Sequence, residues 1–270
     1  MTIELTRFCI NRKIAPALSI EAFFKLVHRA GLNKVELRND MHGGKVTDNL
    51  SYAGVRRLAE RYHLEIVSIN ALYPFNQLND TLLQRTAALL EEAKAVGSNA
   101  LVLCPLNDGS TIATEDMLLA LKTLAPLFQE SGIQGLVEPL GFSTSSLRSM
   151  ASAQALIRAA QLPFRLVLDT FHHYLYEAAE DEFGDLDIHN IGLVHISGVI
   201  DPRPTGMLAD EQRLMLSKND RLDSIGQVQR LEMLGYRGIY AFEPFSSTLE
   251  TWHEADIERE IHHSIALLQA

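Results

Sequence analysis

Short β-branched runs alternate with longer helical patterns along the whole chain, eight times within 270 residues. The strand-like runs cover residues 7–11, 34–38, 65–71 and 100–104, and four more end near residues 138, 169, 195 and 243. Helical spacing of apolar residues predicts helices over 19–31, 51–63, 80–96, 114–131, 150–161, 224–234 and 254–268, with a weaker acidic helix over 174–183. Strict alternation of this kind indicates a parallel sheet with crossover helices.

Eight strand–helix units in a chain of this length predict an α/β fold, a (β/α)8 TIM barrel, with residues 1–270 as a single domain. The competing fold is an open doubly wound sheet, which usually carries a glycine-rich phosphate turn after its first strand. The segment after Ile10 reads Asn-Arg-Lys-Ile-Ala-Pro and has no such glycines. Hydrophobic residues make up 47% of the chain and charged residues 21%, which suits a large folded core.

The charge pattern excludes some classes of partner. The net charge is −10 and no dense Lys/Arg stripe is present, so a nucleic-acid partner is disfavoured. No apolar run approaches the length of a membrane span, and the first residues lack a signal-peptide pattern. Cys9 and Cys104 lie inside apolar runs, as expected for buried thiols in a reducing compartment. We therefore expect a cytoplasmic protein with a small-molecule partner, and the sequence is compatible with a homodimer.

Four successive apolar runs in the second half of the chain end in a metal-binding type of side chain: Glu138, Asp169, His195 and Glu243. In a barrel of this kind the C-terminal ends of the strands face the active site. Four polar groups converging on one buried mouth would be costly without a cation. Carboxylates with one imidazole suit Mn²⁺, Mg²⁺, Co²⁺ or Zn²⁺, and the absence of cysteine ligands argues against a structural zinc. The pattern predicts one divalent metal ion held by these four residues.

Further polar residues near strand ends are candidates for contacts with substrate hydroxyls, namely Asn11, Glu36, Arg38 and Asn70. Trp252, the single tryptophan, follows the last strand and could cover the face of a cyclic polyol or pack on the final helix. The irregular stretch 198–223 follows the strand of His195. A loop of this length in a compact domain is usually functional, so we expect it to form a lid over the site.

The chain resembles the xylose-isomerase-like barrel superfamily of sugar isomerases and epimerases over essentially its full length. The motifs that carry the likeness are Val137-Glu138-Pro139, Asp169-Thr170-Phe171-His172, His195-Ile196-Ser197 and Phe242-Glu243-Pro244. Within the superfamily it most resembles inosose isomerases, which interconvert 2-keto-myo-inositol and 1-keto-D-chiro-inositol. The resemblance implies that the Glu–Asp–His–Glu set binds one metal, commonly Mn²⁺, and that His172 contacts the substrate. Arg203, in the long loop, resembles the family's substrate-side arginine in placement only.

The expected reaction is the isomerisation of a keto-polyol through an enediolate. A metal would act as a Lewis acid on the carbonyl and hydroxyl oxygens of an α-hydroxyketone. Glu138 and Glu243 are the predicted catalytic pair, one removing a proton from carbon and the other returning it to the neighbouring carbon.

Several alternative functions are compatible with the same predicted site residues. An inosose dehydratase would eliminate water from the same substrate, and a hydroxypyruvate isomerase or ketose 3-epimerase also fits. A non-catalytic sugar-binding barrel would bind a polyol without turnover. A three-zinc DNA-repair endonuclease of the same superfamily is disfavoured, because the third strand end reads Ser68-Ile-Asn-Ala-Leu without a histidine and the chain is acidic.

Overall fold

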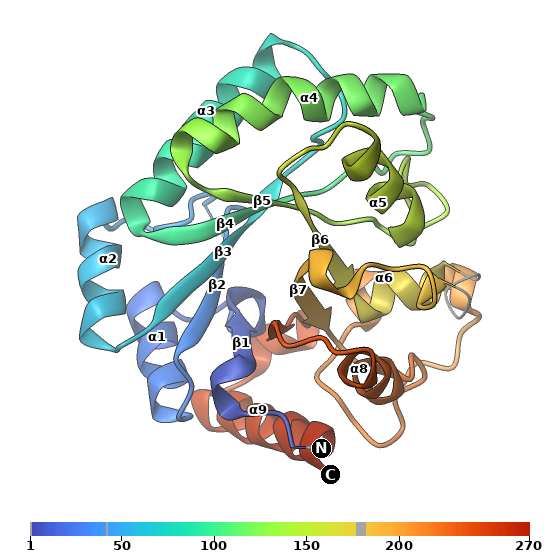
Figure 1. Ribbon diagram of the computed structural model, residues 1–270. Coiled ribbons are helices and arrows are strands. Elements are labelled where there is room, and N and C mark those ends of the chain that lie inside the picture. The colour runs from blue at the N-terminus through green and yellow to red at the C-terminus, as the bar shows by residue number, and fades with distance from the viewer. Residues whose placement is uncertain (1, 42, 177–181) are drawn as a thin grey trace.

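A computed structural model describes residues 2–41, 43–176 and 182–270. Eight parallel strands form a closed barrel in chain order, with β8 hydrogen-bonded back to β1 (Figure 1). The strands are β1 (Phe8–Asn11), β2 (Lys34–Arg38), β3 (Glu65–Leu72), β4 (Ser98–Leu103), β5 (Gln134–Val137), β6 (Arg165–Asp169), β7 (Ile191–Ile196) and β8 (Ile239–Phe242). The predicted (β/α)8 TIM barrel is confirmed.

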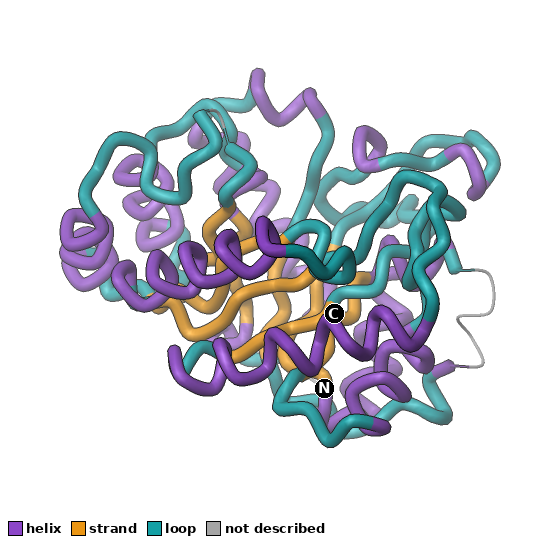
Figure 2. The backbone as a smooth tube through the Cα atoms, turned by 90° about the horizontal axis from the view of Figure 1, so that it is seen from above, coloured by secondary structure: helices purple, strands orange, loops and turns teal. Residues whose placement is uncertain are grey.

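Helices surround the barrel, as the view from above shows (Figure 2). They are α1 (Ile20–Arg29), α2 (Tyr52–Arg61), α3 (Asp80–Val96), α4 (Thr114–Ser131), α5 (Met150–Ala159), α6 (Thr170–Leu175), α8 (Ser224–Met233) and α9 (Glu254–Gln269). The two ends of the chain lie side by side (Figures 1 and 2), and Gln269 Nε2 donates to the Ile3 carbonyl at 2.6 Å. In the described part of the chain no helix is long and apolar enough to span a membrane.

Strand alternation divides the apolar residues into two packed regions. Successive side chains of a strand point to opposite faces, so one set fills the barrel interior and the other meets the helices. Cys9, Val102 and Leu193 belong to the inner cluster, and Phe8 and Ile10 belong to the larger cluster between strands and helices. Both cysteines are buried and unpaired. The same alternation sends the polar residues Asn11 and Glu36 into the barrel.

Most helices begin where the sequence predicts, because short polar side chains cap them. Ser19 and Ser51 accept hydrogen bonds from the backbone amides of Ala22 and Gly54. The weaker helix predicted over 174–183 is misplaced: α6 begins at Thr170, directly after β6, because the Asp169 carboxylate caps its first turn. Residues 177–181 of that prediction lie outside the described residues.

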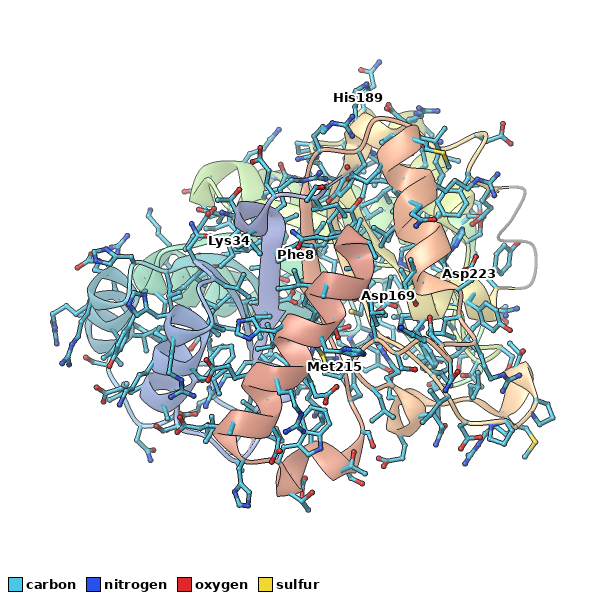
Figure 3. All side chains as sticks on the ribbon, turned by 90° about the horizontal axis from the view of Figure 1, so that it is seen from below. Phe8, Lys34, Asp169, His189, Met215 and Asp223 are labelled. Carbon is cyan, nitrogen blue, oxygen red and sulfur yellow. The ribbon has the colours of Figure 1, made fainter. Side chains whose placement is uncertain are left out.

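The long connection from β7 to α8 is irregular except for two single-turn 3-10 helices, Thr205–Met207 and Asp210–Gln212. An antiparallel bridge between Gly198 and Leu214 folds it back on itself, and the side chain of Leu222 is fully buried. Figure 3, seen from below, labels Met215 in this connection and Asp223 at the start of α8. The connection is therefore a packed structure, and it reaches the C-terminal mouth of the barrel.

Candidate metal centre

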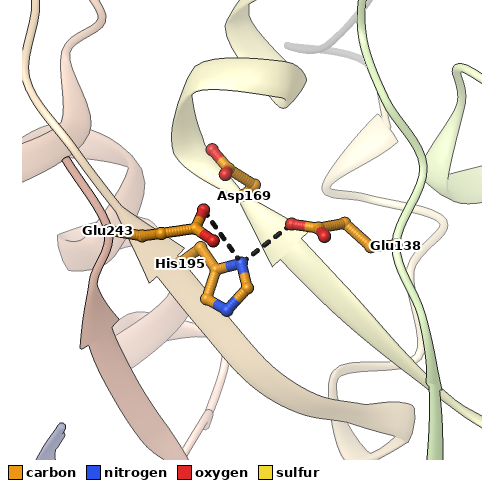
Figure 4. Close-up of side chains that lie close together, drawn as sticks. All are labelled: Glu138, Asp169, His195 and Glu243. Carbon is orange, nitrogen blue, oxygen red and sulfur yellow. Dashed lines mark hydrogen bonds and ion pairs between the residues drawn. The ribbon is translucent and has the colours of Figure 1, made fainter. Parts of the chain in front are cut away.

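Four side chains from neighbouring strands meet at the C-terminal mouth of the barrel (Figure 4). They are Glu138 just after β5, Asp169 at the end of β6, His195 within β7 and Glu243 just after β8. Each offers one ligand atom, and these four atoms lie within 4.8 Å of one another. All four side chains are buried. The structure thus brings together the four residues that the sequence singles out.

Strand register explains why these residues meet. Asp169 pairs with His195 across β6 and β7, so their side chains project at the same level of the barrel. Asp169 is also fixed from the helix side, because its Oδ1 accepts the amide hydrogen of Phe171 at 2.7 Å. Its Oδ2 remains directed to the cluster, where it meets a guanidinium described below.

The imidazole of His195 is held between carboxylates on both edges. Its Nδ1 lies 2.8 Å from Glu138 Oε1 and 3.4 Å from Glu243 Oε2, and its Nε2 lies 3.0 Å from Glu36 Oε2. Burial alone would lower the pKa of His195, but the nearby charges of Glu243, Glu36 and Glu138 outweigh it and raise that pKa well above its usual value. Without an ion, the ring is therefore favoured as an imidazolium.

Two buried arginines, whose contacts the sequence does not reveal, compensate part of the cluster's charge. Arg213, 1% exposed, places Nη2 2.6 Å from Asp169 Oδ2 and 2.8 Å from Glu243 Oε2. Arg38 places Nη1 2.6 Å from Glu243 Oε1. The cost that the sequence predicts without a cation is therefore partly offset by the protein's own arginines. With the His195 imidazolium, two guanidiniums stand against four buried carboxylates, those of Glu36, Glu138, Asp169 and Glu243, so negative charge remains in excess for a cation to offset.

Glu138 and Glu243 have different surroundings. Glu243 Oε1 accepts from Asn11 and Asn70 as well as from Arg38. Burial would raise the pKa of Glu243, but His195, Arg213 and Arg38 lower it far below the usual range. Within the described part of the chain, Glu138 Oε2 accepts a single hydrogen bond, from the Cys104 thiol at 3.3 Å.

Glu138 therefore keeps more accepting capacity than Glu243. Burial would raise the pKa of Glu138, but His195 lowers it overall. Burial raises the pKa of Asp169, although Arg213 and His172 act against that rise.

A pocket of about 430 Å³ opens above the cluster. Among the predicted residues, Arg38, Asn70, Glu138, His172 and Glu243 line it. Other lining groups are polar or aromatic, including Asn39, Asn107, Arg85, Phe142 and Phe245. The size and the mixed lining suit one small polyhydroxylated molecule.

His172 lines this pocket. Its Nδ1 is itself buried and has no hydrogen-bond partner among the residues that the structure describes. A buried polar group without a partner is costly, so a ligand hydroxyl is a natural partner. The ring packs edge-on against Phe142 and Phe171, with ring centroids 5.0 and 5.3 Å away.

Four predicted substrate contacts lie elsewhere. Asn11 is fully buried and donates to Glu36 and Glu243. Arg203 is exposed and pairs with its neighbour Asp201, at 2.8 Å. Trp252 is half-buried and packs against the core cluster between strands and helices. Glu36 is fully buried behind His195 and does not line the pocket. From the long loop, the structure instead brings Asp210 and Arg213 to the pocket.

The four residues fit a divalent ion on the chemistry of their donors. Metal–ligand bonds of about 2.1 Å put opposite ligand atoms about 4.2 Å apart, close to the span of this cluster. Three carboxylates and one imidazole are a hard, mixed oxygen and nitrogen set. The cluster could therefore hold one such ion.

Comparison with known proteins identifies the family of this barrel. A family model described as xylose isomerase-like TIM barrel matches residues 24–269. A xylose isomerase domain containing protein from Salmonella typhimurium LT2 is 62% identical over 100% of both chains, with a TM-score of 0.99. No curated protein matches the sequence.

Two more distant structures share the fold. The IOLI protein, solved with a bound zinc atom, is 19% identical over 97% of this chain and 98% of that one, with a TM-score of 0.85. D-psicose 3-epimerase from Clostridium cellulolyticum H10, solved with D-tagatose, is 12% identical over 98% of this chain and 100% of that one, with a TM-score of 0.68.

Proposed function

We propose, from the premise that this chain belongs to the xylose isomerase-like TIM barrel family, that it is a metal-dependent isomerase of a keto-polyol. The reaction moves a carbonyl group to the adjacent carbon by proton transfer, through an enediolate. The most suitable substrate is an inosose, with interconversion of 2-keto-myo-inositol and 1-keto-D-chiro-inositol.

One observation carries this proposal: two carboxylates belong to a buried four-residue cluster and also line a small polar pocket. A proton transfer between adjacent carbons needs an acid and a base on either side of the reacting atoms. Glu138 and Glu243 meet that requirement, because both face the pocket. Buried, fixed groups of this kind act without reorganising during the reaction.

Glu138, Asp169, His195 and Glu243 would hold the divalent ion. Such an ion would supply Lewis-acid chemistry, drawing electron density from the carbonyl and hydroxyl oxygens of the substrate and lowering the cost of the charge that develops there. Mn²⁺ is the proposed ion. The IOLI protein, which shares this fold, was solved with a bound zinc atom, and this supports a divalent ion as the cofactor here.

Glu138 is the better placed proton acceptor of the two glutamates. Among the described residues its Oε2 has the weakly donating Cys104 thiol as sole partner, so a lone pair remains for a substrate proton. Glu243 is held by Asn11, Asn70 and two arginines and is the weaker base. We assign Glu138 to the removal of the proton from carbon and Glu243 to the return of a proton to the neighbouring carbon.

The pocket walls bind and orient the substrate. His172 Nδ1 is available to one hydroxyl, and the free hydrogen-bonding capacity of Asn70 and Asn107 serves others. Phe142 and Phe245 offer apolar surface to the C–H face of a ring. The loop that carries Asp210 and Arg213 closes one side and excludes water from a charged intermediate.

A ketose 3-epimerase is the second candidate, favoured by the fold shared with D-psicose 3-epimerase across 98% of this chain. Epimerisation beside a carbonyl uses the same proton removal and return, with the proton delivered to the other face of one carbon. An inosose dehydratase uses the same first step and then expels a hydroxyl group. The three reactions give different products from related substrates.

The deciding experiment incubates the Mn²⁺-loaded protein with 2-keto-myo-inositol or D-psicose in D₂O. The protein and its paramagnetic ion are then removed, and NMR identifies the products. An isomerase gives 1-keto-D-chiro-inositol with solvent deuterium on carbon. A dehydratase gives an unsaturated product, and an epimerase acts on D-psicose alone. Recovery of every substrate without change or deuterium uptake would reject the proposal and favour a sugar-binding barrel.

A further inference from the structure

Glu36 on β2 is a fully buried carboxylate with no exposure to the pocket. Asn11 Nδ2 donates to its Oε2, and Ser68 Oγ donates to its Oε1 at 2.9 Å. His195 Nε2 lies 3.2 Å from Oε1 and 3.0 Å from Oε2. Protein groups therefore occupy both oxygens, and full burial keeps a substrate from reaching either of them.

The contact with His195 has a fixed direction. An ionised carboxylate only accepts hydrogen bonds, so the Nε2 of His195 carries the hydrogen in this pair. The opposite edge of the ring then faces the cluster, with Nδ1 2.8 Å from Glu138 Oε1. Rotation of the imidazole ring by half a turn would move Nε2 away from the Glu36 carboxylate and break this ion pair.

We propose that Glu36 is a positioning residue: it holds the His195 ring with Nδ1 toward Glu138, Asp169 and Glu243 and so sets the affinity of the cluster for a divalent ion. The inference deepens the proposed function and rests on its metal site. Carboxylates behind metal-binding histidines fix ring orientation and raise ligand basicity in general. Glu36 thus acts on the chemistry through His195, without touching the substrate.

Residues paired with Glu36 on the two adjacent strands fix the position of its side chain. Asn11 pairs with Glu36 across β1 and β2, and Glu36 pairs with Ser68 across β2 and β3. The three side chains therefore project at one level from three adjacent strands. Strands 1 to 3 support the ring from behind, and strands 5 to 8 supply the proposed ligands. A group supported on strands is held more precisely than one on a loop.

The negative charge of Glu36 selects one orientation of the His195 ring, the one with Nε2 against the carboxylate. Among the residues that the structure describes, His195 is its one ion-pair partner. A buried charge is costly unless it is paired and hydrogen-bonded, so Glu36 favours the arrangement that keeps Nε2 of the ring against it. A glutamine at this position offers one acceptor oxygen only, and its amide would oppose the donating Asn11 amide.

The test compares Glu36→Gln with Glu65→Gln as a matched control. Glu65 starts the neighbouring strand β3, is exposed and pairs with Lys34, so its substitution removes the same charge away from the cluster. Zinc serves as the probe, titrated by calorimetry into metal-free protein. Long-range ¹H–¹⁵N NMR reads the two ring nitrogens of His195, assigned from the spectrum of His195→Gln.

Glu36→Gln should weaken zinc binding by about 10- to 100-fold and shift the His195 ring signals, while Glu65→Gln changes neither. Ser68→Ala, which removes one donor that fixes Glu36, should give smaller changes in the same direction, and it decides the question if Glu36→Gln does not fold. Unchanged His195 signals in a folded Glu36→Gln protein overturn the proposal, whatever the zinc affinity. If the wild-type protein takes up no zinc, the proposed metal site fails, and the ring signals still decide whether Glu36 positions His195.

Discussion

Arg213 Nη2 lies 2.6 Å from Asp169 Oδ2 inside the barrel mouth, although 44 positions of sequence separate the two residues. The same nitrogen reaches Glu243 Oε2 at 2.8 Å, and the guanidinium stacks against Phe245 with 4.5 Å between Cζ and the ring centroid. A loop residue thereby neutralises part of the charge on two proposed metal ligands. Burial tends to lower the pKa of Arg213, but Asp169 and Glu243 raise it, so its positive charge persists.

Arg213→Met should destabilise the metal-free protein, because it leaves two buried carboxylates without this partner. Loss of one member of a buried ion pair costs about 3–5 kcal/mol. Added Mn²⁺ should then raise the melting temperature more in the variant than in the wild type, since a cation replaces part of the missing charge. Thermal unfolding with and without Mn²⁺ measures both effects.

Arg203→Met is the matched control on the same loop. Arg203 is exposed, and in residues 2–41, 43–176 and 182–270 its side chain pairs with Asp201 alone, so this variant should show neither effect. Equal behaviour of the two variants would contradict the role given to Arg213.

Asp169→Asn and His195→Ala should each lower metal content and activity together, because each removes one donor of a four-donor set. Elemental analysis of protein purified in the presence of Mn²⁺ measures the metal. His189→Ala, an exposed histidine just before β7, should retain full occupancy. Full occupancy in both ligand variants would exclude the site as described.

Glu138→Gln should reduce turnover by about 10²–10⁴-fold, as expected for loss of a general base. It should destabilise the fold less than Glu243→Gln, because His195 keeps Glu36 and Glu243 as charged partners. Glu243→Gln should also reduce turnover and, in addition, destabilise the fold by about 3 kcal/mol, because Arg38 and Arg213 lose a charged partner. Steady-state kinetics and urea unfolding separate the two effects, with metal content measured alongside.

The route of the hydrogen is tested with a substrate carrying deuterium on the migrating carbon. Proton transfer through Glu138 and Glu243 predicts exchange with solvent over many turnovers. Complete retention of the label on the product carbon would indicate a hydride shift between the carbons and would falsify the assigned proton transfer.

Glu232, on α8, should make a pH-dependent contribution to stability that is independent of any metal. Burial would raise its pKa, but hydrogen bonds from Arg7, at 2.6 Å, and Tyr240, at 2.7 Å, lower that pKa overall. A carboxyl with a lowered pKa in the folded state stabilises the protein above its unfolded pKa of about 4.3. The contribution should begin to fall near about pH 5 and disappear below the folded pKa.

The difference in free energy of unfolding between wild type and Glu232→Gln should therefore shrink as the pH falls through this range. Urea unfolding at a series of pH values measures it. Glu91→Gln serves as the control, because Glu91 is exposed on α3 and its side chain makes no ion pair or hydrogen bond with the described residues. A difference that stays constant with pH would refute the coupling of Glu232 to Arg7 and Tyr240.

Local sequence determines the barrel and the meeting of the proposed ligands. The period of two within strands and the helical period between them require a parallel sheet covered by helices. Because the C-terminal ends of barrel strands share one mouth, residues at the ends of four successive strands must converge there. Glu138, Asp169, His195 and Glu243 could therefore be predicted as a cluster before any coordinates.

Only the tertiary structure decides what surrounds that cluster. Glu36 and Arg38 are two positions apart on β2 and point the same way, yet Glu36 lies beneath His195 and Arg38 lines the pocket. Depth within the barrel separates them, and depth follows from the stagger between strands, which no local pattern encodes. Arg213 and Arg203 lie in one irregular loop without periodicity, so the path of the loop alone places Arg213 among the carboxylates and Arg203 on the surface. Local periodicity fixes the direction of a side chain from a strand, whereas long-range packing fixes its partners.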